Sequence, residues 1–438
     1  MDNSKGRQAI NSWGIFLIDD IKSPQRNSIA MGPFGSNIKK ENFQAEGIPV
    51  IRGNNLKNSK FVDCNFVYIS DKLANQLSAS LARRLDIILT HRGTIGQVAI
   101  IPPNSKFNTY IVSQSQMKLT LDQTKCDPYF VYYFLRSEFG ISQFLSNSSQ
   151  TGVPAIASPT TALKSIKIPL PPLNKQKAIA KILFDLDSKT ELNQKMNKTL
   201  EAIAQAIFKH WFIDFEFPNE EGKPYKSSGG EMVDSERGEV PKGWKASTIG
   251  KELKTVLGGT PSTENKDYWS NASIPWINSG KINEFRIIFP SAYITVEGLK
   301  HSATKLMPKG TTVLAITGAT LGKVSIIERE MCANQSVVGV LGSEKLPSEY
   351  IYFWIKNNIN RLVSNQTGGA QQHINKGNID EIEILVPDSH IMEHYVKTIR
   401  PIFDKISSSS FEEHNLSKIR DIVLPKLMTG KIRVPLEE

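Results

Sequence analysis

The chain has 438 residues, which is enough for two to four domains at about 100 to 200 residues each. Hydrophobic residues make up 39% and charged residues 22%, close to the average for globular proteins, so an intrinsically disordered chain is excluded. Lys and Arg number 53 against 43 Asp and Glu, and the resulting net charge of +10 favours a polyanionic partner.

Cysteine usage indicates the compartment. Cys64, Cys126 and Cys332 lie far apart with no Cys-x-x-Cys pair, which excludes a disulfide framework and a cysteine zinc site and indicates a reducing, cytoplasmic environment. The N-terminal residues are polar with no apolar signal core, and no window approaches the ~18 consecutive apolar residues of a membrane span. We therefore expect neither secretion nor membrane insertion.

Residues 1–170 have the pattern of a mixed α and β domain. Runs rich in β-branched residues at 86–90 and 98–101 have the length and composition of strands, and Gly-containing turns separate them. The aromatic run at 129–134 is predicted to pack in a core as part of a helix rather than to stack on bases, because a similar run starts at Tyr350. The sequence thus predicts a first α+β domain.

Residues 171–217 are predicted to form a long central helix. Between 175 and about 211 there is no Pro or Gly, and apolar residues recur mostly at steps of three and four. A helix of ~35 residues spans roughly 50 Å, and an apolar stripe of that length needs a partner to cover it. The stripe positions assigned to helix pairing and partner docking are Ile182, Leu186, Leu200, Ile203 and Ile207.

The rest of the chain repeats this plan. Residues 218–242 are rich in Gly, Pro, Ser and acidic residues and are predicted to be an exposed linker. A second α+β domain follows at 243–388, and a second long helix occupies 389–438, which Pro401 and Pro425 are predicted to kink or interrupt. The second stripe consists of Ile399, Ile402, Leu416, Ile419 and Val423.

The two halves align at nearly constant offsets. Residues 48–51 match 274–277 at an offset of 274 − 48 = 226, and the same offset aligns Gly96 with Gly322. Towards the helices the offset settles at 216, where Ile166 aligns with Ile382. The natural partner of each helix stripe is therefore its twin. We predict two similar α/β domains separated by two long helices that pair as an antiparallel coiled coil, in a pseudo-twofold dumbbell.

Several duplicated segments resemble the specificity subunits of type I restriction-modification systems, and the resemblance covers almost the whole chain. In the first half these segments are IPLPPL at 168–173, QKAIA at 176–180, IAQAIF at 203–208 and WFIDF at 211–215. In the second half they are PKGW at 241–244, QTGGAQQHI at 366–374 and IEILVP at 382–387. The first half has QTGVPAI at 150–156 where the second has QTGGAQQH, so the two halves need not contact DNA in the same way.

The resemblance implies that 1–170 and 243–388 are target recognition domains, each recognising one half of a bipartite, asymmetric DNA site. It also implies that two methyltransferase subunits dock on the spacer helices and that restriction subunits can join them. Adenine methylation and cleavage would belong to those partners, together with S-adenosylmethionine, ATP and magnesium, and this chain would not be an enzyme. Physically, a spacer of roughly 50 Å can serve half-sites about one turn, ~34 Å, apart on a duplex.

Candidate DNA contacts are polar residues in loops beside the repeated strands. Lys and Arg neutralise phosphates, while amides and guanidinium groups bond to adenine or guanine edges. In the first half the candidates are Lys39, Lys40, Arg52, Asn54, Asn55, Arg92, Thr94, Gln114 and Gln150. In the second half they are Thr260, Ser262, Thr263, Asn278, Ser279, Lys281, Thr320, Lys323, Gln335, Gln371, Gln372, His373, Asn375 and Lys376. The alternative for each of them is a residue that solvates a loop or caps a turn.

Catalytic and metal motifs occur only as near misses. GATLGKV at 318–324 is one residue shorter than a P-loop and has Val where the metal-binding Ser or Thr belongs. HIMEH at 390–394 fits a zinc-peptidase pattern, but the repeat places Asn174 and Ala178 at the positions of the two histidines, so we expect no metal site. The segment 221–223 could end a nuclease motif but lies in the linker. No methyltransferase motif is present.

Two function classes remain. The first is a sequence-specific DNA-recognition subunit that directs methylation and restriction by partner subunits. The second is a stand-alone DNA-binding scaffold or regulator without modification partners. Capture of partner subunits distinguishes them, because an exposed apolar surface on the helices is expected only if subunits dock there.

Overall fold

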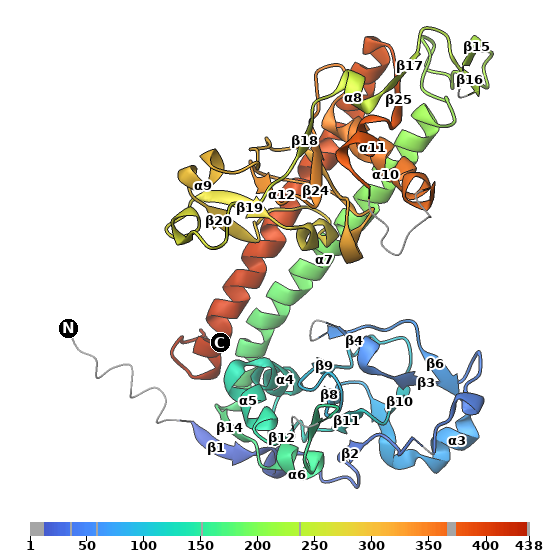
Figure 1. The fold of residues 1–438 in the computed structure, drawn as a ribbon. Coiled ribbons are helices and arrows are strands. Elements are labelled where there is room, and N and C mark those ends of the chain that lie inside the picture. Colours follow the sequence, from blue (N-terminus) through green and yellow to red (C-terminus); the bar gives the residue numbers. More distant parts are fainter. Residues whose placement is uncertain are drawn as a thin grey trace. The chain divides into compact units, whose positions relative to one another are not determined.

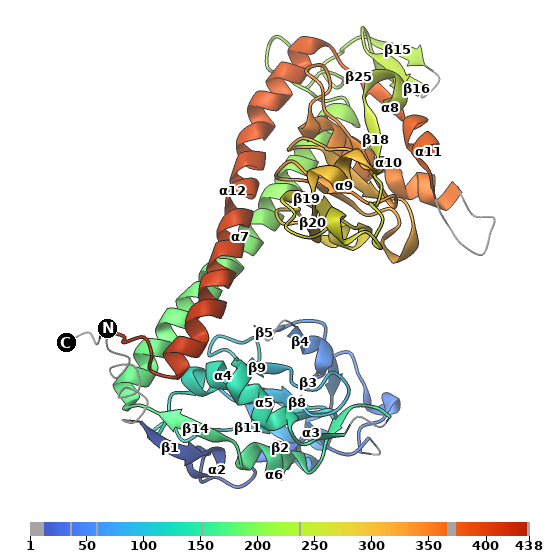
Figure 2. The ribbon, with the colours of Figure 1, turned by 60° about the vertical axis from the view of Figure 1, so that its left-hand side comes forward.

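The computed structural model describes residues 13–35, 37–57, 60–149, 152–235, 238–365 and 374–435 (Figures 1 and 2). The chain divides into two compact units, each described by itself. Unit 1 comprises Met1–Thr190 and Asn415–Glu438, and unit 2 comprises Glu191–His414. The α+β part of each unit is called its lobe below.

The first lobe contains two four-stranded sheets and shorter strand pairs. One sheet has the order β2 (Ile29–Met31), β11 (Gln116–Leu119), β8 (Ile87–Thr90), β9 (Val98–Ile100). The other has the order β6 (Val67–Ile69), β3 (Ile48–Ile51), β10 (Thr109–Val112), β7 (Leu81–Arg83). The pairs are β1 (Gly14–Leu17) with β14 (Lys167–Leu170), β4 (Leu56–Lys57) with β5 (Lys60–Phe61), and β12 (Ser148–Ser149) with β13 (Ala155–Ile156). The helices are α2 (Ile18–Ile21), α3 (Asp71–Gln76), α4 (Pro128–Arg136), α5 (Glu138–Leu145) and α6 (Pro159–Lys164).

The second lobe repeats most of this topology, with three described strands instead of four in one of its sheets. Its sheets have the orders β18 (Thr255–Leu257), β24 (Val337–Val340), β21 (Thr312–Ala315), β22 (Val324–Ile326) and β20 (Ala292–Ile294), β19 (Ile274–Ile277), β23 (Cys332–Ala333). The pairs are β17 (Lys245–Thr248) with β25 (Glu383–Val386) and β15 (Met232–Ser235) with β16 (Gly238–Pro241). The helices are α8 (Ile249–Glu252), α9 (Val296–Lys300), α10 (Ser348–Asn365) and α11 (Lys376–Asp380). The predicted duplication of a mixed α and β domain is confirmed.

Alternating burial explains how the sheets stack. In β8, Ile87 and Leu89 pack into the core that contains α4, while Ile88 packs towards the sheet that contains β3. In β21, Leu314 packs towards α10 while Val313 faces the other core. Successive side chains of a strand point to opposite faces, so each of these sheets is buried on both sides and needs the apolar runs that the sequence contains.

Tight glycine turns join the central strands. Gly96 lies between β8 and β9 with φ of 84°, and Gly322 lies between β21 and β22 with φ of 78°. This left-handed conformation is strained for residues with a Cβ. The matching glycines therefore preserve the same hairpin in both lobes.

The aromatic helices form the base of each lobe. In α4, Phe130, Tyr133 and Phe134 are buried in the first lobe's main core, and in α10, Tyr350 and Phe353 are buried in the second's. Asp127 caps α4 by accepting a hydrogen bond from the amide of Phe130 (2.9 Å), and Pro128 follows at the first turn. The prediction that the 129–134 run packs in a core is confirmed.

Two long helices take part in both units. α7 is Leu173–Phe212 and α12 is Ser389–Met428, each 40 residues long. In unit 2 they run antiparallel, because Asn193 contacts Glu412 while Trp211 contacts Tyr395. In both views α7 and α12 lie side by side within each unit (Figures 1 and 2). The prediction of two long helices that pair antiparallel is confirmed.

The buried stripe of α7 differs from the predicted one. The buried residues in its middle are polar: Asp187, Thr190, Asn193, Asn197 and Glu201. Three residues of the predicted stripes are instead exposed: Ile182 and Ile203 of α7 and Ile419 of α12. The apolar periodicity of the sequence did not predict this buried contact between α7 and α12, because its side chains are polar and are buried with hydrogen-bond partners. Asn193 Nδ2 donates to Glu412 Oε2 (2.8 Å) and Asn197 Nδ2 donates to Glu413 Oε1 (2.7 Å).

The two prolines were predicted to kink or interrupt α12, and the structure shows that they do not interrupt it. A proline inside a helix removes one backbone hydrogen bond and costs about 3 kcal/mol. Around Pro401, Ile399 and the half-buried Phe403 pack in the main core of unit 2 and Ile406 is also buried, and this burial offsets the cost. Pro425 lies in the last turn before the helix ends at Met428.

The segment predicted to be an exposed linker contains ordered turns. Its residues are mostly exposed, but Tyr225 stacks on Phe217 (4.5 Å between ring centroids), which precedes the segment and also stacks on Trp244 (5.3 Å). The hairpin β15–β16 follows these turns. Aromatic stacking thus holds part of this segment against the start of the second lobe.

Candidate nucleic-acid interface

Strand pairing brings four loops together at one edge of the first lobe. β3 and β10 run parallel with Ile51 opposite Val112, so the loops that follow them begin side by side. β8 pairs with β11 with Thr90 opposite Gln116, which adds the loop after β8. The Gly32 amide donates to the Gln116 carbonyl (2.8 Å) and adds the loop after β2. The first four-loop edge consists of 32–35, 52–55, 91–94 and 113–116.

The second lobe builds the same edge. β19 and β23 run parallel with Ile277 opposite Ala333, and β21 pairs with β24 with Ala315 opposite Val337. The amide of Gly258 donates to the carbonyl of Val337 (3.0 Å), as Gly32 does to Gln116. The second four-loop edge consists of 258–262, 278–281, 317–320 and 334–336.

Most of the described candidate DNA contacts lie at these two edges. In the first lobe they are Arg52, Asn54, Asn55, Arg92, Thr94 and Gln114, and in the second they are Thr260, Ser262, Asn278, Ser279, Lys281, Thr320 and Gln335. Lys39, Lys40, Thr263 and Lys323 are exposed and lie within five residues of an edge loop. Asn375 and Lys376 lie at the start of α11, and Gln150, Gln371, Gln372 and His373 lie outside the described residues.

Four of the candidates have structural roles in the described structure, and whether they also contact DNA stays a prediction. Asn55 is fully buried, and its Nδ2 donates to the carbonyls of Val62 (3.0 Å) and Cys64 (2.9 Å), so it holds the 52–55 loop. The other three have local roles: Thr320 is buried, Asn375 caps α11, and Lys376 pairs with Asp380 (2.6 Å). The sequence could not separate these from free loop residues, because loop capping and base contact use the same residue types.

A polar network under the first edge was not predicted. Gln116 is buried, its Nε2 donates to Thr90 Oγ1 (3.3 Å), and it accepts from the hydroxyl of Ser113. Thr90 in turn donates to Gln97 Oε1 (3.0 Å). These bonds connect the strand ends that carry the 91–94 and 113–116 loops. The sequence contains no signal of this network, because Gln116 and Lys118 alternate with Met117 and Leu119 in β11, a pattern that predicts a solvent-facing polar side.

The first edge has cationic groups that remain available to an anion. Arg92 is exposed, and the buried Nε of Arg52 has no hydrogen-bond partner among the described residues. His91, between Thr90 and Arg92, is buried, and burial lowers the pKa of its imidazole, so this ring is neutral at pH 7. The positive charge of this edge therefore comes from Arg52 and Arg92.

The exposed glutamines occupy equivalent places in both edges. Gln114 and Gln335 are each exposed between two half-buried residues, and each follows the strand that pairs in parallel. In the second lobe Thr260 Oγ1 donates to Gln335 Oε1, which orients that amide. An exposed amide on an ordered loop can make two hydrogen bonds to an adenine edge, donating one and accepting the other.

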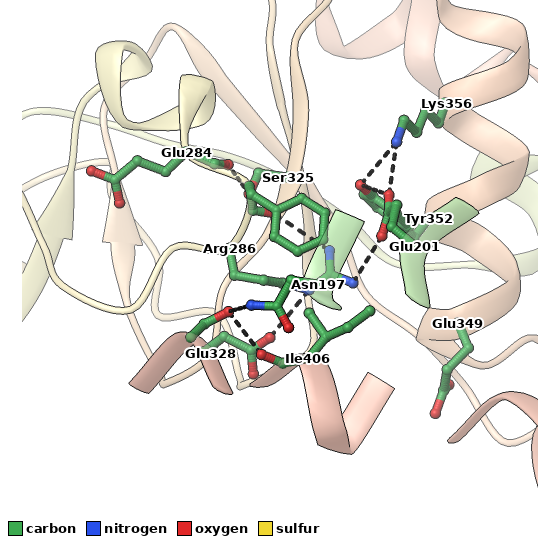
Figure 3. A network of polar contacts seen from close by, with 12 residues as sticks. Asn197, Glu201, Glu284, Arg286, Ser325, Glu328, Glu349, Tyr352, Lys356 and Ile406 are labelled. Atoms are coloured by element: carbon green, nitrogen blue, oxygen red, sulfur yellow. Dashed lines mark hydrogen bonds and ion pairs between the residues drawn. The ribbon is translucent and has the colours of Figure 1, made fainter. Parts of the chain in front are cut away.

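A buried ionic network joins the second lobe to both long helices (Figure 3). The Arg286 side chain is 1% exposed and lies between Glu201 of α7 (3.5 Å) and Glu328 (3.4 Å). Glu328 also accepts a hydrogen bond from Ser407 of α12 (2.7 Å). The rings of Phe285, Tyr352 and Phe403 lie 4.8, 4.9 and 5.0 Å from the guanidinium carbon. Such a cation is well placed to fix the lobe on the helices.

The two lobes use a common tyrosine–cation pair for this attachment. In the first lobe Arg136 donates to Tyr132 Oη (3.0 Å) and to Asp187 of α7 (2.8 Å). In the second, Lys356 donates to Tyr352 Oη (3.4 Å) and to Glu201 of α7 (2.7 Å). Both tyrosines and both cations are related by the offset of 220.

The pKa shifts at these junctions indicate stable ionisation. Burial disfavours the charged form of Asp187, but Arg136 and Arg420 outweigh burial and lower its pKa. Burial also opposes the charge of Lys356, yet Tyr352 and Glu201 raise its pKa. Both groups therefore stay charged near neutral pH.

Some features are absent from the described part of the chain. It holds no group of three or more His, Cys, Asp or Glu side chains that could bind a metal ion. None of its helices is both long and apolar enough to cross a membrane. His394, from the HIMEH segment, packs its ring edge-on against Trp211 at 5.3 Å.

Comparison with known proteins gives consistent results. Residues 35–202 and 241–418 each match the family model of the type I restriction modification DNA specificity domain. The chain is 27% identical to the type I restriction enzyme MjaIX specificity subunit of Methanocaldococcus jannaschii, with 96% of this chain and 94% of that protein covered. It is 25% identical to the HindI specificity subunit of Haemophilus influenzae, with 92% and 98% covered.

A solved structure supports the fold. The S subunit of a type I restriction-modification system from M. genitalium superposes with a TM-score of 0.60, at 15% identity, over 95% of this chain and 96% of that one. The two family matches cover most of both lobes and most of α7 and α12. The chain therefore belongs to the type I restriction modification DNA specificity family, with two copies of the family's domain.

Proposed function

We propose that this chain is the DNA-recognition subunit of a type I restriction-modification complex and that it recognises a bipartite, asymmetric DNA site. The observation that carries the proposal is the duplicated four-loop edge. The two edges share one backbone plan, yet Arg52 and Arg92 of the first correspond to Asn278 and Gly318 of the second at spacings of 226 residues. Two similar frames with different side chains suit two different half-sites.

DNA binding would combine charge and base contacts. The net charge of +10 and the exposed Lys39, Lys40, Arg92 and Lys323 supply phosphate contacts, which fix position without carrying sequence information. Gln114 and Gln335 supply amides for base edges. Because phosphate contacts are independent of sequence, added salt would weaken binding to every duplex. Because each amide contacts one base, its replacement would alter the preference at one base pair.

The chemistry would belong to partner subunits. In this proposal two methyltransferase subunits bind S-adenosylmethionine and methylate adenine, and restriction subunits use ATP and magnesium to cleave DNA in the cytoplasm. Exposed apolar residues on the long helices support docking of such partners. In unit 1 these are Ile182, Phe184, Ile419 and Ile422. Apolar side chains exposed on a charged helix surface are typical of an interaction site.

The decisive experiment is a methylation map of the source cell with and without this chain. Single-molecule sequencing should reveal one bipartite motif, two short half-sites around an unspecified gap, that loses adenine methylation on deletion. Re-expression of the chain should restore it. An unchanged map would favour the alternative of a stand-alone DNA-binding scaffold. Co-purification tests that alternative separately, since a scaffold would not capture methyltransferase subunits.

A further inference from the structure

Phe34 is a large apolar side chain exposed on an ordered loop of the first four-loop edge. Its side chain is 72% exposed, between Gly32 and Gly35 in the loop that follows β2. Scattered exposed apolar residues are common on protein surfaces, so exposure alone assigns no role. The position of this ring beside polar groups suited to DNA is what distinguishes it.

The loop is held in place by its glycines. A Cβ at Gly32 would lie 1.9 Å from the carbonyl oxygen of Ser113, and a Cβ at Gly35 would lie 2.7 Å from Oε1 of Gln114. The Asn37 amide donates to the Phe34 carbonyl (2.8 Å), which closes the turn. The loop therefore rests directly on 113–116, and Phe34 is presented one residue away from the contact with Gln114.

The second lobe has a polar residue at the same position. Gly32 and Gly258 are equivalent, because both amides bond to β11 or β24 and a Cβ on either would strike a backbone oxygen, that of Ser113 or Asn334. Two residues further along, Phe34 corresponds to Thr260. The Thr260 hydroxyl bonds to Gln335, whereas a phenyl ring cannot orient Gln114 in this way.

We propose that Phe34 is a specificity-determining residue that contacts the C5 methyl group of a thymine in the half-site of the first lobe. This inference rests on the proposed function. An apolar side chain on the same four-loop edge as an exposed amide and two arginines matches the major-groove pattern, in which the thymine methyl group is the apolar feature among hydrogen-bonding edges. The loop is already ordered, so little conformational entropy is lost when the ring is buried.

The test uses the full chain assembled with its methyltransferase subunits. Binding and methylation are measured on duplexes in which each base pair of both half-sites is varied, for wild type, Phe34→Ala and Phe34→Thr. Both variants should bind the cognate site about tenfold more weakly and lose the preference for thymine at one position of one half-site. Uracil in place of that thymine should cost wild type a similar factor and cost Phe34→Ala nothing further.

Ile15→Ala is the matched control. Ile15 is 71% exposed on β1, which pairs with β14 and contributes no loop to the four-loop edge, so its loss should leave DNA binding unchanged. Thermal denaturation checks that Phe34→Ala, which removes an exposed ring, is as stable as wild type.

The outcomes separate the two levels of the proposal. If wild type recognises a bipartite site and Phe34→Ala recognises it equally well, this inference is wrong while the proposed function stands. If Phe34→Ala weakens binding equally on every duplex, the ring does not contact a methyl group and the inference is overturned. It is also overturned if wild type binds equally well with uracil in place of the thymine while 2-aminopurine fluorescence shows unstacking at one base step. If wild type shows no sequence preference, the proposed function itself fails.

Discussion

Asp187 illustrates how a single buried carboxylate joins sequence-distant elements. It accepts hydrogen bonds from Tyr133 (3.0 Å), Arg136 (2.8 Å) and Arg420 (2.7 Å), which come from α4 and α12. Its side chain is only 9% exposed. The apolar stripe predicted from the sequence does not include this position, because a carboxylate interrupts a hydrophobic pattern and its buried partners cannot be identified from the sequence.

Replacing Asp187 by Asn should destabilise the protein by about 3 kcal/mol, because two arginines lose a buried counter-charge. Asp185→Asn is the control: Asp185 pairs with Lys181 at 2.6 Å but is 56% exposed, so its loss should cost less than about 1 kcal/mol. Denaturant unfolding measures both. Equal effects of the two substitutions would show that the buried site adds no stability.

The lowered pKa of Asp187 predicts an acid limb in stability. A carboxylate whose folded pKa lies below its unfolded value, about 3.9, stabilises the fold fully above that value and loses the contribution as pH falls through the folded pKa. Melting temperatures between about pH 6 and pH 2 should therefore fall less steeply in Asp187→Asn than in wild type. Parallel curves would mean that Asp187 is not preferentially ionised in the fold.

At the scale of elements, the second lobe depends on Arg286 for its attachment to α7 and α12. Arg286→Met retains much of the side-chain volume but leaves Glu328 buried without its cation, so we expect a loss of about 3 to 5 kcal/mol. Adding Glu328→Gln should recover part of this loss, because the uncompensated charge is removed. Hydrogen exchange in α10 and β22 would report the loosening.

A surface pair in the same lobe provides the comparison. Lys300 and Glu297 form a salt bridge at 3.2 Å with both side chains more than half exposed. Lys300→Met should change stability by less than about 1 kcal/mol. If Arg286→Met has an equally small effect, the network in Figure 3 does not hold the lobe to the helices.

The exposed apolar residues of α12 predict where partners dock. Ile419→Asp and Ile422→Asp introduce charge at half-exposed positions, so folding should be nearly unaffected while capture of methyltransferase subunits falls at least tenfold, because burying an unpaired charge in an interface is costly. Ile15→Asp controls for an added surface charge. Pull-down of methyltransferase subunits measures the capture. If both α12 variants capture them as well as wild type does, this face of α12 is not the docking site.

At the scale of the whole molecule, the two lobes keep the same contacts with different chemistry. Tyr129 packs edge-on against Phe184 (5.2 Å) in unit 1, and the equivalent positions in unit 2 hold the salt bridge of Glu349 with Arg400 (2.9 Å). The offsets are 349 − 129 = 220 and 400 − 184 = 216. The duplicated backbone therefore carries an aromatic contact in one unit and a salt bridge at the equivalent positions of the other, so its side chains can diverge while the fold is kept.

This divergence predicts independent half-sites. Gln114→Ala should relax base preference in one half-site and Gln335→Ala in the other, each weakening cognate binding by about 1 to 3 kcal/mol, because each amide lies on a separate lobe. Methylation of a duplex library by the assembled complex measures both. An effect of both substitutions on the same half-site would contradict the proposed division of recognition.

The sequence by itself determined the duplication, the α+β class, the two long helices and the absence of recognisable catalytic motifs, because repeats and helical periodicity are local patterns. Only the tertiary structure decided which residues share a site. The four-loop edges depend on the parallel pairing of β3 with β10 and of β19 with β23, and the polar seam of α7 depends on partners from distant elements. Whether Asn55 bonds to its own loop or Phe34 lies exposed beside Gln114 follows from packing, which no local pattern encodes.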